Sequence, residues 1–270
     1  MNWRNIALLL RFDLLYSLMR LRAWVFLIPF GLFWFITFYY LVGDEDLIGK
    51  FTSSETEGLM KIYGYDTVVN LFINHPISIS LPHMLLVITT PFFVVLASYG
   101  QFCQDMRVGF YRFLTTRCRR IEIFLGQFLS AIFLITLAFL AVSIISATLS
   151  MQNDGFPAAA VIPYAMQTYF AALLYALPYV ALMALLSAFF NSQIAVLFFG
   201  MGFCGVVYLF FIYSVLTQGV SLVAFSLPIG LFRDLFKLET TEYFTALAIL
   251  PVYFIAYCTL AISVFDRRNF

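Results

Sequence analysis

The sequence predicts an all-α integral membrane protein, and three observations support this fold class. The 270-residue chain is 63% hydrophobic and 11% charged, whereas a soluble domain is about a quarter charged. Its apolar residues are gathered into six runs, each long enough to cross the hydrocarbon core, which takes about 20 helical residues. None of the six runs contains an Asp, Glu, Lys or Arg. Because lipid offers backbone groups no hydrogen-bond partner, each run must be a helix.

Residues 1–22, which precede the first apolar run, have a different pattern. On a helical wheel one arc holds the polar residues Asn2, Asn5, Asp13, Ser17 and Arg20, and most Leu and Phe side chains lie elsewhere. This pattern is typical of an amphipathic helix that lies along the membrane surface. Two further arginines fall on the apolar side and must extend their charged ends toward water. We therefore expect an N-terminal interfacial helix before the first span.

The six predicted spans form one bundle over residues 23–265 of a chain that is a single domain, residues 1–270. The spans are Ala23–Val42, His83–Cys103, Ile123–Leu149, Tyr164–Phe190, Ile194–Val215 and Tyr243–Phe265. Residues 266–270 follow as a short tail.

The positive charges predict the orientation of the bundle. Eleven of the fifteen Lys and Arg residues fall on one side of the predicted bundle. Cytoplasmic segments of membrane proteins are enriched in Lys and Arg, so this side is the cytoplasmic one. They are Arg4, Arg11, Arg20, Arg22, Arg107, Arg112, Arg117, Arg119, Arg120, Arg267 and Arg268. Both termini and the loop between the second and third spans are therefore predicted to be cytosolic.

One outward segment, Thr217–Thr241, predicts an external re-entrant element before the sixth span. Its stretch GVSLVAFSLPIGLF is apolar over fourteen residues, too short to cross the membrane, and contains a Pro-Gly break at Pro228–Gly230. We expect apolar side chains of this segment to form an external plug, with Arg233 and Asp234 left at the water interface. The predicted plug residues are Phe225, Leu227 and Phe232.

The sequence holds no pattern of catalytic, metal-binding or nucleotide-binding residues. Its nearest match to a phosphate-binding loop, GDEDLIGKF at Gly43–Phe51, has one residue too many between the glycines and three carboxylates that would repel phosphate. The four cysteines fall at the cytosolic side or within spans, so no disulfide is expected. Two isolated histidines, His75 and His83, make a poor metal site. We expect a chain that is not an enzyme and that binds no cofactor or metal itself.

The uncharged spans also argue against ion-coupled transport, because proton and sodium relays place ionisable groups at mid-membrane. If the chain moves a cargo uphill, the energy must come from another polypeptide.

The arginine-rich segment QFCQDMRVGFYRFLTTRCRRIEIFLGQ, Gln101–Gln127, resembles the corresponding segment of type-2 ABC exporter permeases. In that family an acidic residue, a Gly-Thr pair, a leucine pair, a proline, a basic residue, a Glu-Ile pair and a Gly-Lys pair lead into the third span. The matching residues here are Asp105, Gly109, Phe113-Leu114, Arg119-Arg120, Glu122-Ile123 and Gly126-Gln127. The departures are Phe110 for Thr, Thr116 for Pro and Gln127 for Lys.

The resemblance implies a permease, the transmembrane subunit of an ABC transporter in a bacterial inner (plasma) membrane. Such permeases pair with a second copy or a related permease and with two cytosolic ABC ATPase subunits, which bind ATP and Mg. Membrane lipids and an extracytoplasmic accessory protein are further candidate partners, and nucleic acid is not expected. A short helix between spans two and three would couple to the ATPase. The implied coupling residues are Asp105, Arg107, Gly109, Phe110, Tyr111, Arg112, Phe113, Arg117, Arg119, Arg120 and Glu122. The alternative is that these arginines contact phospholipid headgroups.

The resemblance also implies that the second and fifth spans line the substrate path. The implied path residues are Thr89, Thr90, Phe93, Ser98, Phe199, Cys204, Tyr208 and Phe211. An aromatic and uncharged lining suits a hydrophobic or amphipathic cargo such as a lipid, a lipid-linked molecule, a peptide or a drug-like compound. The alternative is that these side chains pack against lipid or other helices. Two other functions stay open: a subunit that passes ATPase work to an extracytoplasmic partner, and an ATPase-independent channel or scramblase.

Overall fold

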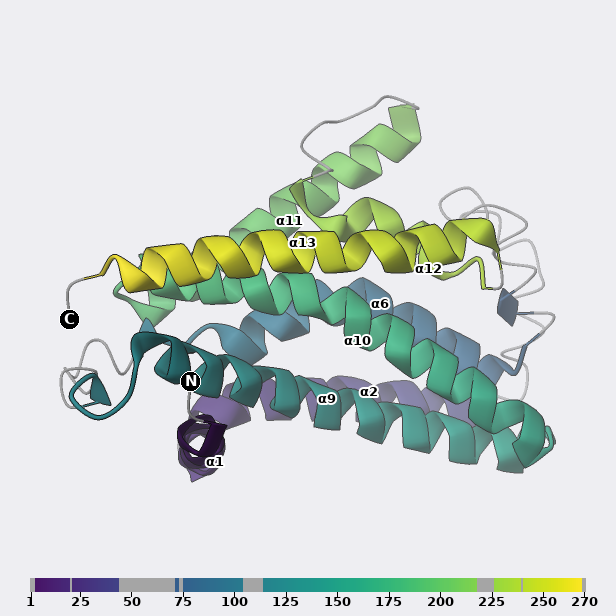
Figure 1. Ribbon diagram of the computed structural model, residues 1–270. Coiled ribbons are helices and arrows are strands. Elements are labelled where there is room, and N and C mark those ends of the chain that lie inside the picture. The colour runs from purple at the N-terminus through teal and green to yellow at the C-terminus, as the bar shows by residue number, and fades with distance from the viewer. Residues whose placement is uncertain are drawn as a thin grey trace.

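The computed structural model describes residues 3–19, 21–43, 71–72, 75–103, 114–217, 226–238 and 240–268, and the regular structure in these ranges is helical, without strands. The elements in chain order are α1 (Trp3–Met19), α2 (Leu21–Gly43), α6 (Ile77–Ser98), α9 (Arg120–Gln152), α10 (Ala158–Phe189), α11 (Gln193–Thr217), η3 (Pro228–Leu231), α12 (Phe232–Leu235) and α13 (Thr241–Asp266). Figure 1 shows the long helices running side by side, with both ends of the chain at one end of the bundle. We call this end the termini face and the opposite end the distal face.

Six of these helices, α2, α6, α9, α10, α11 and α13, are long and apolar enough to cross a membrane. The chain is therefore an all-α, multi-pass membrane protein, as the sequence predicted. Two predicted span starts, His83 and Tyr164, are wrong by about two turns, because α6 begins at Ile77 and α10 at Ala158. The prediction stopped at the preceding prolines, but Pro82 and Pro163 both lie inside helices. Each is the sixth residue of its helix, past the four N–H groups that lack an intrahelical acceptor, and prolines inside membrane helices are tolerated because neighbouring groups satisfy the freed backbone.

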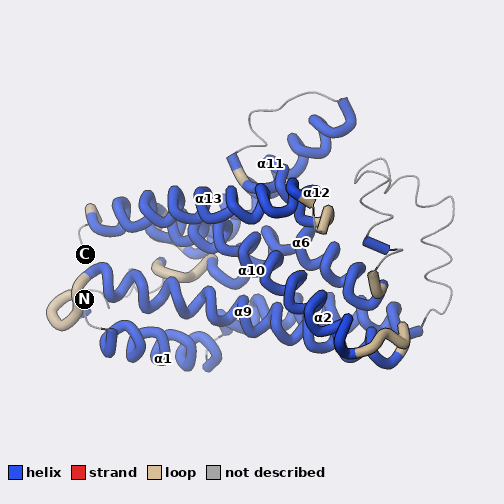
Figure 2. Tube along the Cα trace, turned by 45° about the vertical axis from the view of Figure 1, so that its right-hand side comes forward, coloured by secondary structure: helices blue, strands red, loops and turns tan. Residues whose placement is uncertain are grey.

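Helix α10 lies at the centre of the bundle, between α13 on one side and α9 on the other (Figure 1). Its buried face is rich in alanine, which lets neighbouring backbones approach closely where lipid gives no hydrophobic drive to associate. These buried alanines are Ala171, Ala172, Ala176, Ala181, Ala184 and Ala188. Helix α11 diverges from the other spans toward one end, as both views of the chain show (Figures 1 and 2).

An aromatic cluster joins α2, α6 and α9. The Phe30 ring of α2 packs edge-on against Phe93 of α6 at a centroid distance of 5.0 Å, and it stacks on Phe139 of α9 at 6.4 Å. Phe33 and Phe26 of α2 contact the same Phe93 ring at 5.5 and 6.5 Å. Aromatic pairs in these geometries each add about 0.5–1.5 kcal/mol beyond area burial. The cluster therefore fixes α2 on the bundle.

Helix α1 lies across the termini face, seen end-on in Figure 1 where the spans run lengthwise. Its buried side chains are Ile6, Asp13 and Ser17, whereas Leu8 and Phe12 are exposed. Asp13 and Ser17 of the polar arc noted in the sequence thus face the protein, and Leu8 and Phe12 face outward. The position of α1 on a membrane surface stays a prediction.

Candidate functional site

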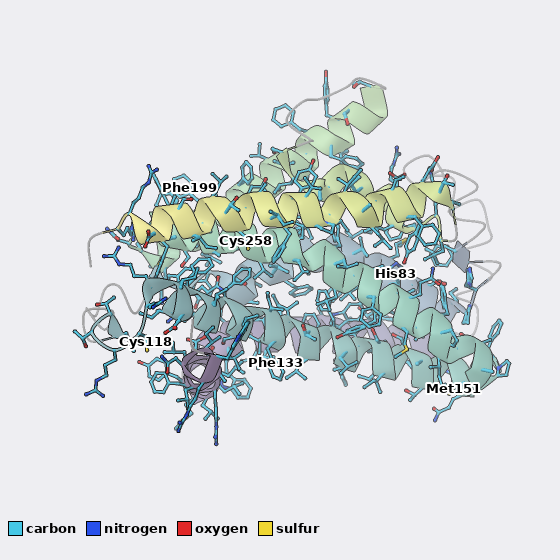
Figure 3. The ribbon with its side chains drawn as sticks, viewed as in Figure 1. His83, Cys118, Phe133, Met151, Phe199 and Cys258 are labelled. Carbon is cyan, nitrogen blue, oxygen red and sulfur yellow. The ribbon has the colours of Figure 1, made fainter. Side chains whose placement is uncertain are left out.

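A groove of about 810 Å³ opens on the termini face, where α1, the start of α9 and the end of α13 meet. Cys118, which lines it, lies at this end of the molecule in Figure 3, and Met151 marks the distal end. The lining residues are Asn5, Thr115, Thr116, Arg117, Cys118, Arg119, Arg120, Ile121, Glu122 and Asp266. Eight of these ten residues have a charged, hydroxyl or amide side chain that can donate or accept hydrogen bonds, so the groove suits a polar partner.

Glu122 connects two walls of this groove. Its carboxylate accepts a hydrogen bond from the Asn5 Nδ2 of α1 at 3.2 Å and from the Arg119 backbone N–H at 3.3 Å. The second bond satisfies a backbone donor at the start of α9, as a Glu at the third helical position commonly does. The side chain is only 3% exposed. Glu122 therefore holds α1 against the first turn of α9.

One turn further along α9, Gly126 lets the two helices touch. A Cβ added to Gly126 would lie 2.6 Å from the Leu9 Cβ and 3.5 Å from the Ile6 carbonyl oxygen, both on α1. The first distance is shorter than any real Cβ contact, and the Leu9 Cβ is fixed to its backbone. Only glycine at this position allows α1 to lie so close to α9.

Two arginines join the helix ends of the termini face. The Arg120 Nη1 donates to the carbonyls of Asp266 and Arg268 at the end of α13, the second at 3.0 Å. The Arg268 Nη2 in turn donates to the carbonyl of Phe189, the last residue of α10. The last carbonyls of a helix have no intrahelical donor and carry partial negative charge, so a guanidinium there is favourable. We name these contacts the arginine relay. It ties α9, α13 and α10 together.

The predicted coupling residues divide into three groups. Arg120 and Glu122 are engaged within the chain, as described above. Arg117 and Arg119 also line the groove, but their side chains are exposed. The others, Asp105, Arg107, Gly109, Phe110, Tyr111, Arg112 and Phe113, lie outside the described residues. Sequence reasoning placed both termini on the same side as this loop but missed the contacts of Asn5, Asp266 and Arg268 with α9, because their long separation from α9 in the chain left no local signal.

The predicted path residues of α6 and α11 lie on two helices that pack together. A Cβ added to Gly200 of α11 would lie 3.2 Å from Val95 Cγ1 of α6, and the Phe92 and Tyr208 rings are 6.4 Å apart. Phe93 packs into the aromatic cluster. Thr89 and Thr90 donate to carbonyls one turn back, at 2.7 and 2.6 Å. The role of these residues in transport stays a prediction.

The remaining path residues are distributed over two faces of α11 and the end of α6. Cys204 and Phe211 are buried and Tyr208 is half-buried, so the side of α11 that carries these three residues is turned toward the protein. Phe199 is 57% exposed, which agrees with its position at the outside of the bundle in Figure 3. Its ring stacks on the Phe190 ring at a centroid distance of 4.6 Å. Ser98, at the end of α6, is buried.

The predicted plug segment forms η3 and α12 and is packed into the bundle. Leu227 and Phe232 are both buried, while Phe225 lies outside the described residues. The Phe232 ring contacts Phe211 of α11 at 5.0 Å and Phe236 at 5.7 Å. We name the segment Leu227–Leu238 the distal cap.

Charged groups lie at the edge of the distal cap. The Arg233 guanidinium lies 5.8 Å above the Phe211 ring, in cation–π geometry. Lys237 contacts Asp234 at 3.6 Å and donates to Glu242. Burial raises the pKa of the Asp234 carboxyl, and the hydrogen bond to Glu242 raises the pKa of Lys237. Within the described residues no group of three His, Cys, Asp or Glu side chains is placed to hold a metal ion.

Comparison of the sequence with protein-family models and with curated proteins finds no match. The resemblance to the exporter permeases therefore stays a prediction from the residues of the arginine-rich segment.

Proposed function

We propose that this chain is the permease subunit of an ATP-driven ABC exporter, and that cytosolic ATPase subunits dock in the groove of the termini face. The observation that carries the proposal is that Arg117 and Arg119 stand exposed in a polar groove whose walls are held rigidly. Exposed arginines beside a groove suit a protein partner that inserts a helix or loop, because such charges fix register and orientation.

The contacts around the groove are suited to transmitting movement. A displacement of residues 114–119 is passed directly to α9, and Glu122 and Gly126 pass it on to α1. The arginine relay passes it to α13 and α10. A partner that pulls on this segment therefore acts on four helices at once. We propose that ATP-driven closure of the ATPases rocks the bundle in this way.

The cargo path is proposed to lie between two copies of the chain. The two internal cavities described in the bundle each offer about 10 Å³ to the centre of a water molecule, far less than any cargo needs. A hydrophobic or amphipathic cargo, such as a lipid, lipid-linked molecule, peptide or drug-like compound, fits the uncharged outer surface of the spans better than their interior. A second permease copy would enclose that surface.

The proposal predicts that the groove faces the cytosol. Cysteine placed at exposed Thr116 should react with an impermeant maleimide only after cells are permeabilised. Cysteine placed at exposed Asn153, in the distal turn between α9 and α10, should react in intact cells. The background carries Cys118→Ser, because Cys118 lines the groove and is partly exposed, and a cysteine-to-serine parent serves as the control. Labelling at Thr116→Cys in intact cells would reverse the orientation and remove the docking proposal.

The proposal also predicts that charge in the groove is needed for ATPase binding. The tagged chain purified from its native cells should retain a stoichiometric ATP-hydrolysing partner, identified by mass spectrometry. Arg117→Glu or Arg119→Glu should each weaken that association at least tenfold, because loss of an interfacial arginine anchor commonly costs about 2 kcal/mol or more. Arg267→Glu is the matched control, since Arg267 is exposed on the same face but does not line the groove.

The same experiment separates the alternatives. Equal ATPase retention by all three variants would favour contacts of these arginines with phospholipid headgroups. Lipid movement in vesicles that hold the purified chain alone would favour the ATPase-independent channel or scramblase. Retained ATPase without cargo movement would favour a subunit that passes work to an extracytoplasmic partner.

A further inference from the structure

A small cavity lies between α6, α9 and α10, in the half of the bundle nearer the distal cap. The volume open to the centre of a water molecule is about 10 Å³. Figure 3 shows His83, one of its lining residues, close to the distal end of the bundle. The lining residues are Ile79, Pro82, His83, Leu86, Val142, Ser143, Ser146, Ala165 and Thr168.

Two side chains that line this cavity have buried polar atoms without a partner among the described residues. They are a ring nitrogen of His83 and the hydroxyl of Ser146. His83 is 3% exposed and Ser146 is 1% exposed, so neither reaches bulk water. The two come from different helices, α6 and α9. Buried polar atoms in folded proteins are nearly always hydrogen-bonded, to protein or to ordered water.

The backbone of Leu235 in the distal cap is a hydrogen-bond partner of the His83 imidazole, which leaves one ring nitrogen in need of a partner. The other neighbours do not supply one. The Phe236 ring of the distal cap meets the imidazole edge-on at 5.9 Å, and a phenyl ring offers no conventional hydrogen bond. The Thr168 hydroxyl already donates to the carbonyls of Tyr164 and Ala165 in its own helix, at 3.1 and 3.0 Å. Pro82, also in the lining, has no N–H to offer.

We propose that this cavity is a binding site for one water molecule, held between the imidazole of His83 and the hydroxyl of Ser146. A cavity of this volume takes a single water, and a water needs two to four polar partners. With one ring nitrogen at the Leu235 backbone, the other can accept a hydrogen bond from the water, and a serine hydroxyl can donate or accept, so one water matches both. A hydrated metal cation does not suit the site, because hard cations require six or more oxygen ligands. The site is independent of the exporter proposal.

The bound water would link α6 to α9 directly beneath the distal cap. Membrane helices with an internal proline commonly use ordered water to satisfy polar groups that the helix leaves open.

A thermal double-mutant cycle tests the proposal on the full chain in lipid nanodiscs. Ser146→Ala and His83→Leu should each lower Tm by about 2–4 °C, because each leaves the other polar group, or the water, short of a partner. The double variant should lower Tm no more than the worse single variant, since both polar groups are then gone. Ser150→Ala is the matched control: Ser150 is a buried serine one turn along α9 that does not line the cavity. Its effect should add to that of His83→Leu.

A structure at a resolution that shows ordered solvent provides the second test and does not depend on stability. One density peak is expected within hydrogen-bond distance of both His83 and Ser146, and Ser146→Val should remove it by filling the cavity with a methyl group. Additive Tm shifts for His83→Leu and Ser146→Ala, or an empty cavity in the unsubstituted protein, would overturn the proposal.

Discussion

Replacing Gly126 with valine is expected to detach α1 from α9. A Cβ at this position would lie 2.6 Å from the Leu9 Cβ, and the valine methyl groups would extend further into α1. Neither backbone can give way without breaking the Asn5–Glu122 hydrogen bond. Forced overpacking of this kind costs about 1–3 kcal/mol. Hydrogen–deuterium exchange should show loss of protection over Trp3–Met19, with little change over α10.

Two other glycines provide graded controls for this prediction. A Cβ at Gly202 would meet no atom within 4 Å, so Gly202→Ala should leave exchange and Tm unchanged. A Cβ at Gly200 would meet the Met183 Sδ at 2.8 Å, but a thioether end can rotate away, so Gly200→Ala should have a small effect. Unchanged protection of α1 in Gly126→Val would show that α1 is not seated on α9.

Replacing Phe232 with alanine is expected to be the most destabilising single truncation in the distal cap. The side chain is 3% exposed and lies between the Phe211 and Phe236 rings, at 5.0 and 5.7 Å. Deleting a buried phenyl ring costs about 3–5 kcal/mol, because the lost burial adds to the cavity left behind. The measurement is Tm in nanodiscs. In the proposed exporter the same variant should also raise basal ATPase activity, since the cap would close the bundle less firmly.

Phe244→Ala is the control for the cap prediction. Phe244 is 61% exposed on α13, so its truncation removes little packing within the chain. A Phe232→Ala variant with the Tm of Phe244→Ala would mean that the cap is not held by its aromatic contacts. Phe232→Leu should fall between the two, because it keeps part of the buried volume.

The spans were predictable because hydropathy over about 20 residues depends on composition alone. The span starts at His83 and Tyr164 were less predictable, because a proline commonly ends a helix but is tolerated inside a helix of a membrane bundle. Sequence alone does not show whether the helix begins after the proline or already includes the residues before it. The helices begin at Ile77 and Ala158.

The termini face was only partly predictable. The spacing of Asn5, Asp13 and Ser17 marked a polar arc. The hydrogen-bond partner of Asn5 could not be predicted, because Glu122 lies 117 residues further along the chain and comes close only in the folded protein. The role of Arg120 could not be read from its charge, since the positive-inside pattern marks every cytosolic arginine alike. Arg120 differs from Arg117 and Arg119 because the end of α13 lies within its reach. Arg120 donates to carbonyls there, whereas Arg117 and Arg119 are exposed in the groove.

The arginine relay has a consequence for how the protein is made. Arg120 and its acceptor Arg268 are separated by 148 residues, so the bond between them cannot form until α13 has left the ribosome. During synthesis α9 and α10 must therefore enter the membrane with the carbonyl end of α10 open to water. A nascent chain halted before Asp266 would keep that end open. Closure of the relay is thus a late step in the assembly of the bundle.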